Sequence, residues 1–124
     1  YLRNYDGDFA TVRGKNFVNS SQLSKKTDIK QLDVDKVRNA IRNVDIREYR
    51  YKSDVKNGED KVYASAIIDD VNDTPQYNIP FDWISADGTG RDDGTATGYL
   101  IVTAQDLYNK IDELESEIKK LKGE

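Results

Sequence analysis

The stretch Leu107-Tyr-Asn-Lys-Ile-Asp-Glu-Leu-Glu-Ser-Glu-Ile-Lys-Lys-Leu121 decides the fold of this chain. Its branched apolar residues recur at alternating intervals of four and three positions: Leu107, Ile111, Leu114, Ile118 and Leu121. This is the heptad seam of a coiled coil, with isoleucine at the a positions and leucine at the d positions. The pattern predicts a long C-terminal helix, residues 103–122, that associates with copies of itself.

The residues beside this seam carry complementary charges. In a parallel pair of helices, Lys110 meets Glu115 of its neighbour, and Glu117 meets Lys122. Isoleucine at a with leucine at d favours a dimer in isolated peptides, but two and a half heptads do not settle the number of chains. The alternative is a single amphipathic helix that packs on its own domain.

Two segments precede this helix: a turn-rich stretch, residues 87–98, and then a short apolar run, residues 99–102. The run Tyr99-Leu-Ile-Val102 predicts a short buried strand, and Thr103 with Asp106 predicts a capping box at the helix start. Residues 87–98, rich in Gly and Asp, predict a mobile hairpin tip. Their ligand order does not match a calcium loop, and they lack the Gly-Lys-Ser/Thr ending of a phosphate loop, so no metal or cofactor is expected.

The middle of the chain predicts a helix followed by two paired strands. Residues 33–43 have Asp33 as the N-cap and one apolar face, formed by Val34, Val37 and Ile41. Residues 44–52 and 61–68 are rich in β-branched residues and tyrosine, which favours strands. Asn57-Gly58 between them is the strongest short hairpin signal. We therefore expect an antiparallel pair.

The first 20 residues alternate short apolar stretches with Gly and Asn. This pattern predicts short strands ending at Gly7 and Gly14, too few to close a core. The segment fits the last rung of an extended β structure, or an arm that packs on a neighbour. A disordered leader is the alternative.

Composition narrows the class of protein further. With 124 residues, of which 36% are hydrophobic and 34% charged, the chain has a thin core for one independent domain, a deficit that oligomerisation would repair. A net charge of −4 without a basic stripe argues against nucleic acid, and no apolar run is long enough to cross a membrane. The start at Tyr1 and the absence of methionine predict a piece of a longer protein.

The absence of His and Cys excludes histidine-assisted and thiolate chemistry, which directs attention to serine and lysine. Residues 20–29 read Ser-Ser-Gln-Leu-Ser-Lys-Lys-Thr-Asp-Ile and place a lysine five positions after a serine twice, as Ser20 with Lys25 and Ser21 with Lys26. A serine becomes a nucleophile when a base takes its proton, and a neutral lysine can be that base. A solvated loop is the simpler interpretation of this spacing.

Three parts of the chain resemble one known family. Residues 21–29 are similar to an opening pattern of serine, aspartate, three variable residues, lysine, a variable residue, asparagine and isoleucine. Residues 62–71 resemble the family's central strand that runs into a helix containing Glu-Val, and residues 99–121 its closing strand and long helix. The family is the self-cleaving C-terminal intramolecular chaperone domain of phage tailspikes, tail fibres and neck appendages, of the endosialidase type. The acidic, tyrosine-rich composition looks most like neck appendages of short-tailed Bacillus phages.

This resemblance implies a fold and a function. The fold is α+β: a stalk-like β segment at residues 1–20, then a chaperone domain at residues 21–124 with a small antiparallel sheet, a short helix and a long C-terminal helix. Three chains form an intertwined homotrimer through the seam. The domain registers the upstream stalk of the same polypeptide and is then released from the virion appendage precursor, made in the host cytoplasm, by autoproteolysis. Partners other than self and stalk, including nucleic acid and membrane, are not expected.

The resemblance also assigns roles to single residues. Ser21 is the nucleophile at the Ser20–Ser21 bond, and Lys26 is its base. Two positions depart from the family pattern, because Gln22 replaces aspartate and Asp28 replaces asparagine. A carboxylate at Asp28 would favour the charged lysine unless it points away or itself assists as a base.

Two other functions fit the same sequence. A purely structural trimerisation or receptor-binding tip would form the trimer without cutting itself. A monomeric binding module would use the aromatic residues Tyr77, Phe81 and Trp83 as a ligand surface, although such residues more often form a core or an interface.

Overall fold

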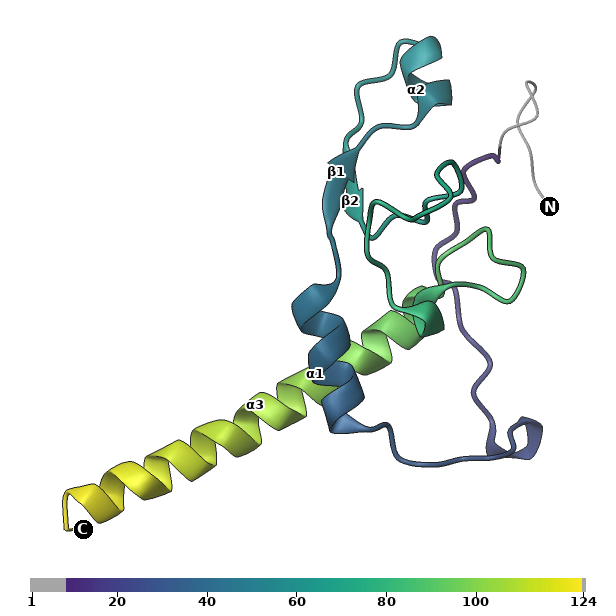
Figure 1. Cartoon of the computed structure of the whole chain (residues 1–124). Coiled ribbons are helices and arrows are strands. Elements are labelled where there is room, and N and C mark those ends of the chain that lie inside the picture. Colours follow the sequence, from purple (N-terminus) through teal and green to yellow (C-terminus); the bar gives the residue numbers. More distant parts are fainter. Residues whose placement is uncertain (1–8, 124) are drawn as a thin grey trace. The chain divides into compact units, whose positions relative to one another are not determined.

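The computed structural model describes residues 9–123. This part of the chain is a small α+β fold, as expected, with a long C-terminal helix (Figure 1). Its helices are α1 (Val34–Asn43), α2 (Lys52–Lys56) and α3 (Asp93–Leu121), and its strands are β1 (Arg47–Tyr49) and β2 (Tyr63–Ser65). Two short 3-10 turns are η1 (Leu23–Lys25) and η2 (Phe81–Trp83).

The chain divides into two units. One comprises the residues up to Gln31 together with Arg50–Lys61, and so holds η1 and α2. The other comprises Leu32–Tyr49 and the residues from Val62 onward, and so holds α1, the sheet, η2 and α3. The predicted boundary between residues 20 and 21 separates a stalk segment from a chaperone domain and does not refer to compact units. It stays a prediction.

Helix α1 forms where the sequence predicts it. The Asp33 side chain accepts a hydrogen bond from the backbone N–H of Asp35 at 3.0 Å, which caps the helix and satisfies one of its free donors. Of the predicted apolar face, Val37 is fully buried, Ile41 is half-buried and Val34 is exposed. The helix therefore uses a narrower apolar face than the sequence suggests.

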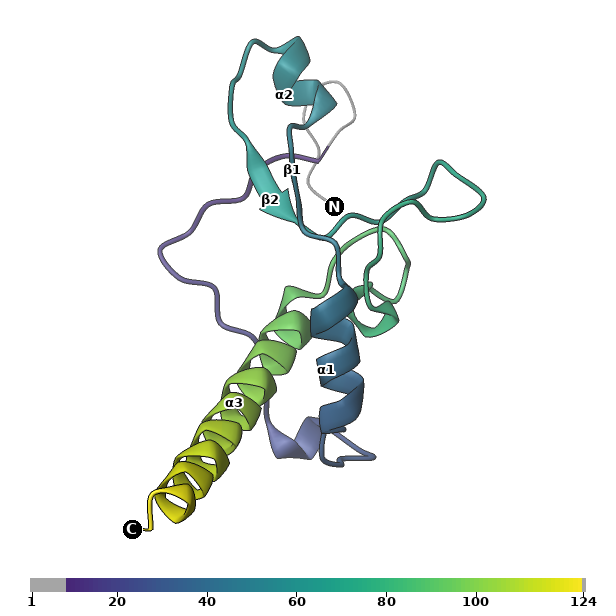
Figure 2. The same ribbon diagram turned by 60° about the vertical axis from the view of Figure 1, so that its left-hand side comes forward.

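The core of the second unit lies where α1 crosses the N-terminal part of α3 (Figures 1 and 2). Val37, Trp83 and Tyr99 form its centre, and the two aromatic rings meet edge to face with centroids 5.8 Å apart. Half-buried residues complete it: Leu32, Ala40, Ile41, Val44, Ile79, Ala96 and Val102. Among the described residues only Ala66 is also buried, so the thin core expected from composition is confirmed.

The two strands pair in the predicted antiparallel sense but are short. β1 and β2 lie side by side, with Arg47 opposite Ser65 and Tyr49 opposite Tyr63 (Figure 2). The predicted hairpin turn at Asn57-Gly58 is wrong, because α2 occupies part of the connection. Asn57 is the C-cap of that helix and Gly58 has φ of +77°, so this dipeptide ends a helix instead of joining two strands.

The predicted strand at residues 99–102 is also wrong, since these residues lie inside α3. The helix begins at Asp93 and not at Thr103, and its cap is Asp92, whose side chain accepts from the Thr95 N–H. Residues 87–98 are thus only partly a hairpin tip: Ile84 and Arg91 form one antiparallel bridge, and the rest is the first turn of the helix. The predicted capping box of Thr103 and Asp106 is wrong as well, because both residues lie inside α3.

The described N-terminal residues form no strand. Residues 10–20 are irregular, and Phe9 alone is in a β bridge. The strand expected to end at Gly14 is therefore absent, while the one ending at Gly7 lies outside the described residues.

The helix expected after the central strand is likewise missing. Beyond β2 the residues up to Pro80 are irregular. The Asp69 carboxylate organises this loop by accepting hydrogen bonds from the backbone N–H groups of Val71, Asn72 and Gln76. These bonds, and one from the Asn72 side chain, hold the pKa of Asp69 well below its usual range.

Candidate functional site

Ser21 and Lys26 are in direct contact. Lys26 Nζ donates a hydrogen bond to Ser21 Oγ at 2.6 Å. The 3-10 turn η1 creates this contact, because the Lys25 N–H bonds to the Gln22 carbonyl at 3.1 Å and the Lys26 N–H to the Leu23 carbonyl at 3.0 Å. The turn brings residues five positions apart together, which an extended chain would hold far from each other.

The alternative pair is not formed. Among the residues that the structure describes, no hydrogen bond joins Ser20 to Lys25. Lys25 is the last residue of the 3-10 turn, whereas Lys26 follows it in extended conformation and reaches back to Ser21. Of the two registers in the sequence, the geometry favours Ser21 with Lys26.

The surroundings of this pair are open in the single chain. Ser21 and Lys26 are both exposed, and the apolar side chains on either side, Leu23 and Ile29, are 73% and 65% exposed. The pair thus has the contact that proton transfer requires but lacks a dry environment of its own. A lysine becomes neutral most readily where water is excluded.

Asp28 turns the chain just after Lys26. Its φ of +54° lies in the left-handed region, where Asn and Asp are the commonest residues after Gly. This conformation is therefore compatible with either asparagine or aspartate at this position. No ion pair joins Asp28 to Lys26 in the described part of the chain.

A second polar cluster lies in the other unit, beside the core. Asp82 Oδ2 accepts a hydrogen bond from the Tyr99 hydroxyl at 2.7 Å and pairs with Lys36 Nζ at 2.5 Å. Both bonds favour the ionised carboxylate, so they lower the pKa of Asp82, with Lys36 the larger cause. Burial raises the pKa of Tyr99, and the bond to Asp82 raises the pKa of Lys36.

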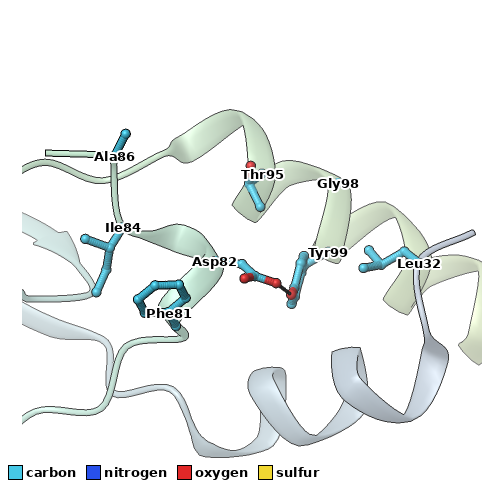
Figure 3. Close-up of a pocket in the computed structure, with 8 residues that line it drawn as sticks. All are labelled: Leu32, Phe81, Asp82, Ile84, Ala86, Thr95, Gly98 and Tyr99. Carbon is cyan, nitrogen blue, oxygen red and sulfur yellow. Dashed lines mark hydrogen bonds between the residues drawn. The ribbon is translucent and has the colours of Figure 1, made fainter. Parts of the chain in front are cut away.

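This cluster lines an open hollow of about 600 Å³ (Figure 3). Its wall is mostly apolar and is formed by Leu32, Phe81, Asp82, Ile84, Ala86, Thr95, Gly98 and Tyr99. The polar groups that face it are already engaged with each other, as the bond drawn between Asp82 and Tyr99 shows (Figure 3). The cluster therefore ties η2 to α1 and α3.

The three aromatic residues of the predicted ligand surface do not share one environment. Trp83 is 7% exposed and belongs to the core, whereas Phe81 is 86% exposed. Tyr77 lies near Arg47, whose guanidinium carbon is 6.0 Å from the ring centroid. These positions do not form a common aromatic surface.

The seam residues of α3 are all uncovered. Leu107, Ile111, Leu114, Ile118 and Leu121 are between 48% and 88% exposed. Because α3 begins early, the 4-3 spacing continues backwards to Ala104 and Leu100, which are exposed as well. The helical stripe is therefore one heptad longer than the sequence indicated.

A third polar contact, missed in the sequence, fixes α1 on α3. The Arg38 guanidinium makes a two-pronged contact with Asp106, at 2.7 and 2.6 Å. The bond from Arg38 holds the pKa of Asp106 below its usual range. Nothing in a single sequence signals a pair separated by 68 positions.

Neither a metal-binding group of side chains nor a membrane-spanning helix is found among the described residues. Within residues 9–123 no group of three or more His, Cys, Asp and Glu side chains could hold a metal ion. In the same range, none of the helices combines the length and apolar character needed to span a bilayer.

No protein-family model, curated protein or solved structure matches this chain.

Proposed function

We propose that this chain is an autoproteolytic intramolecular chaperone of a phage tailspike, tail fibre or neck appendage. It trimerises, registers the upstream stalk of its own polypeptide, and cuts itself off at the Ser20–Ser21 bond. The observation that carries the proposal is the 2.6 Å contact between Ser21 Oγ and Lys26 Nζ, in a chain without histidine or cysteine.

The reaction needs only these two side chains and water. Neutral Lys26 takes the Ser21 hydroxyl proton as Oγ attacks the carbonyl carbon of Ser20. The peptide C–N bond breaks, the proton passes to the departing Ser21 amine, and an ester joins the Ser20 carbonyl to Ser21 Oγ. Water hydrolyses this ester and leaves a carboxylate at Ser20 and a free hydroxyl at Ser21.

The exposed seam of α3 supports the chaperone part of the proposal. A helix with an unpaired apolar stripe of three heptads gains stability by associating with copies of itself. Association places three chains in register, which lowers the entropic cost of pairing distant stalk segments. Once cleavage releases the domain, the assembled stalk is trapped kinetically because its template has gone.

Assembly also gives a reason for the timing of the cut. Both members of the pair are exposed in the single chain, and a charged lysine cannot accept a proton. If neighbouring chains cover the site, loss of water favours the neutral amine. Cleavage then follows assembly, and premature release is avoided.

Intact mass of the expressed chain tests this function. The wild type is expected to give residues 21–124 as a product, whereas Ser21→Ala and Lys26→Ala remain whole, a loss of at least 100-fold in rate. Lys25→Ala is the matched control, since it removes the neighbouring lysine, and it should still be cut. Cleavage that persists in Lys26→Ala and disappears in Lys25→Ala would assign the base to the other register.

A non-cleaving trimerisation or receptor-binding tip is the second candidate. The observation that favours it is the exposure of Ser21 and Lys26 in the single chain, where no dry surroundings enclose the pair. This function predicts the same trimer. A wild type that assembles and stays whole would support it.

A further inference from the structure

The base and the nucleophile of the proposed cleavage belong to the same polypeptide. We infer that in the assembled protein each chain cuts itself with its own Ser21 and Lys26, and that neighbouring chains supply surroundings but not the lysine. This inference rests on the proposed function. It concerns the origin of the base, which an intertwined assembly leaves open because segments of different chains lie close together.

The local backbone already completes the pair. The contact at 2.6 Å is formed within one chain, and both residues lie in the same structural unit. The two backbone hydrogen bonds of η1, from Lys25 to Gln22 and from Lys26 to Leu23, link only residues within the segment 22–26. The geometry therefore needs no long-range contact and no second chain.

The residues on both sides of Lys26 restrict where its side chain can go. Before it, η1 reverses the chain direction. After it, Asp28 in the left-handed region turns the chain again. A lysine held between two local turns thus lies within hydrogen-bonding distance of its own Ser21 without any contribution from another chain.

The nucleophile is intrachain by its chemistry. Ser21 Oγ attacks the carbonyl carbon of Ser20, to which its own nitrogen is bonded, so the acyl group moves from N to O within one residue. Only the acceptor of the proton could come from another chain. The identity of that acceptor is a question that mixed assemblies can answer.

The test uses two full-length versions of the chain, each with a different affinity tag after Glu124. Wild type with one tag is co-expressed with Lys26→Ala carrying the other, and assemblies with both tags are isolated by sequential affinity purification. Intact mass then reads which of the two chains has lost residues 1–20. A second mixture combines Ser21→Ala with Lys26→Ala.

We expect the wild-type chains to be cut and the Lys26→Ala chains to stay whole in the same assemblies. In the second mixture neither chain should be cut. Wild type mixed with Ser21→Ala should be cut at the rate of pure wild type, which shows that mixed assemblies are competent.

Two results would overturn the inference alone. One is cleavage of Lys26→Ala chains in either mixture, since only a neighbour could then supply the lysine. The other is a wild-type chain that loses its activity beside Lys26→Ala although pure wild type is cut. If pure wild type is never cut, the proposed function fails and the inference fails with it.

Discussion

The two parts of α3 differ in what covers them. In the N-terminal part, residues 93–106, Tyr99 is 2% exposed in the core, and Asp106 is bonded to Arg38 of α1. In the C-terminal part, residues 107–121, every side chain is exposed, and the helix extends past α1 (Figures 1 and 2). One helix thus joins a completed core to a surface that the single chain leaves uncovered.

The comparison separates the folding of the single chain from the association that we propose, along one helix. The N-terminal part is apolar on two faces: one packs on α1, and the other exposes Leu100 and Ile101, each at 56%. A helix that is apolar all round is normally buried. The C-terminal part has no such core contact, and an isolated helix of this length is only marginally stable in water. In the proposed trimer, pairing of the seam supplies the stability that this part lacks alone.

The largest effect is expected from charging the seam. Ile111→Asp combined with Ile118→Asp places carboxylates at two a positions and should abolish association at micromolar concentration, because each loses about 2–5 kcal/mol of apolar burial and adds a buried charge. Sedimentation analysis should show a monomer. The near-ultraviolet signal of Trp83 should persist, since the core lies in the other part of the helix.

The control for this variant adds the same charge to the outer face of α3. Asn109 and Ser116 are exposed and lie off the heptad seam. Asn109→Asp with Ser116→Asp should leave the assembly intact. If both double variants dissociate equally, net charge and not the seam governs association.

An intermediate effect should separate two aromatic residues of η2. Trp83 is 7% exposed and Phe81 86%. In the monomeric Ile111→Asp, Ile118→Asp background, Trp83→Ala should lower the free energy of unfolding by about 3–5 kcal/mol, and Phe81→Ala by less than about 0.5 kcal/mol. Urea unfolding followed by far-ultraviolet circular dichroism measures both.

The comparison of Trp83→Ala with Phe81→Ala decides whether the small core stabilises the second unit in the absence of other chains. Similar losses in the free energy of unfolding for the two variants would mean that the core around Trp83 does not stabilise the single chain. A Trp83→Ala variant that no longer unfolds cooperatively would count as a loss at the upper end of the range.

The accuracy of the sequence-based predictions follows the range of the interactions involved. Asp33 as a cap and the Ser21–Lys26 pair depend on neighbours within a few positions, and both are found in the structure. The heptad seam is periodic, so its residues can be identified from their spacing alone, without knowledge of what the helix packs against. Only its start was misplaced.

The errors arise where one local pattern serves two structures. Residues 99–102 are continuously apolar, and a short run of this kind fits a buried strand or a helix that is apolar on two faces. Asn57-Gly58 likewise fits a hairpin or a helix end, since both need a left-handed residue. The contact between Arg38 and Asp106 depends on the packing of α1 on α3, which residue spacing does not encode.

The smallest effect is expected from the contact between Arg38 and Asp106, which lies at the junction between the two parts of α3. The bond from Arg38 lowers the pKa of Asp106 in the folded state, so the unfolded chain binds the proton more tightly. The stabilisation is therefore complete above the ordinary carboxyl pKa of about 3.9 and is lost as the pH falls through the lower pKa of the folded state. Asp106→Asn should reduce the midpoint of thermal unfolding at pH 7, and less so in acid.

The pH dependence distinguishes an ionic contribution from simple packing. The monomeric background is used again, and Asp112→Asn serves as the control because Asp112 is exposed about 1.7 turns further along α3, in the part without core contacts. The difference between the parent and Asp106→Asn should shrink steadily as the pH is lowered from 5 to 2, over the range in which carboxylates take up protons. A difference that stays constant with pH would mean that Asp106 acts through shape and not charge. An equal effect of Asp112→Asn would remove the distinction between the two parts of the helix at this junction.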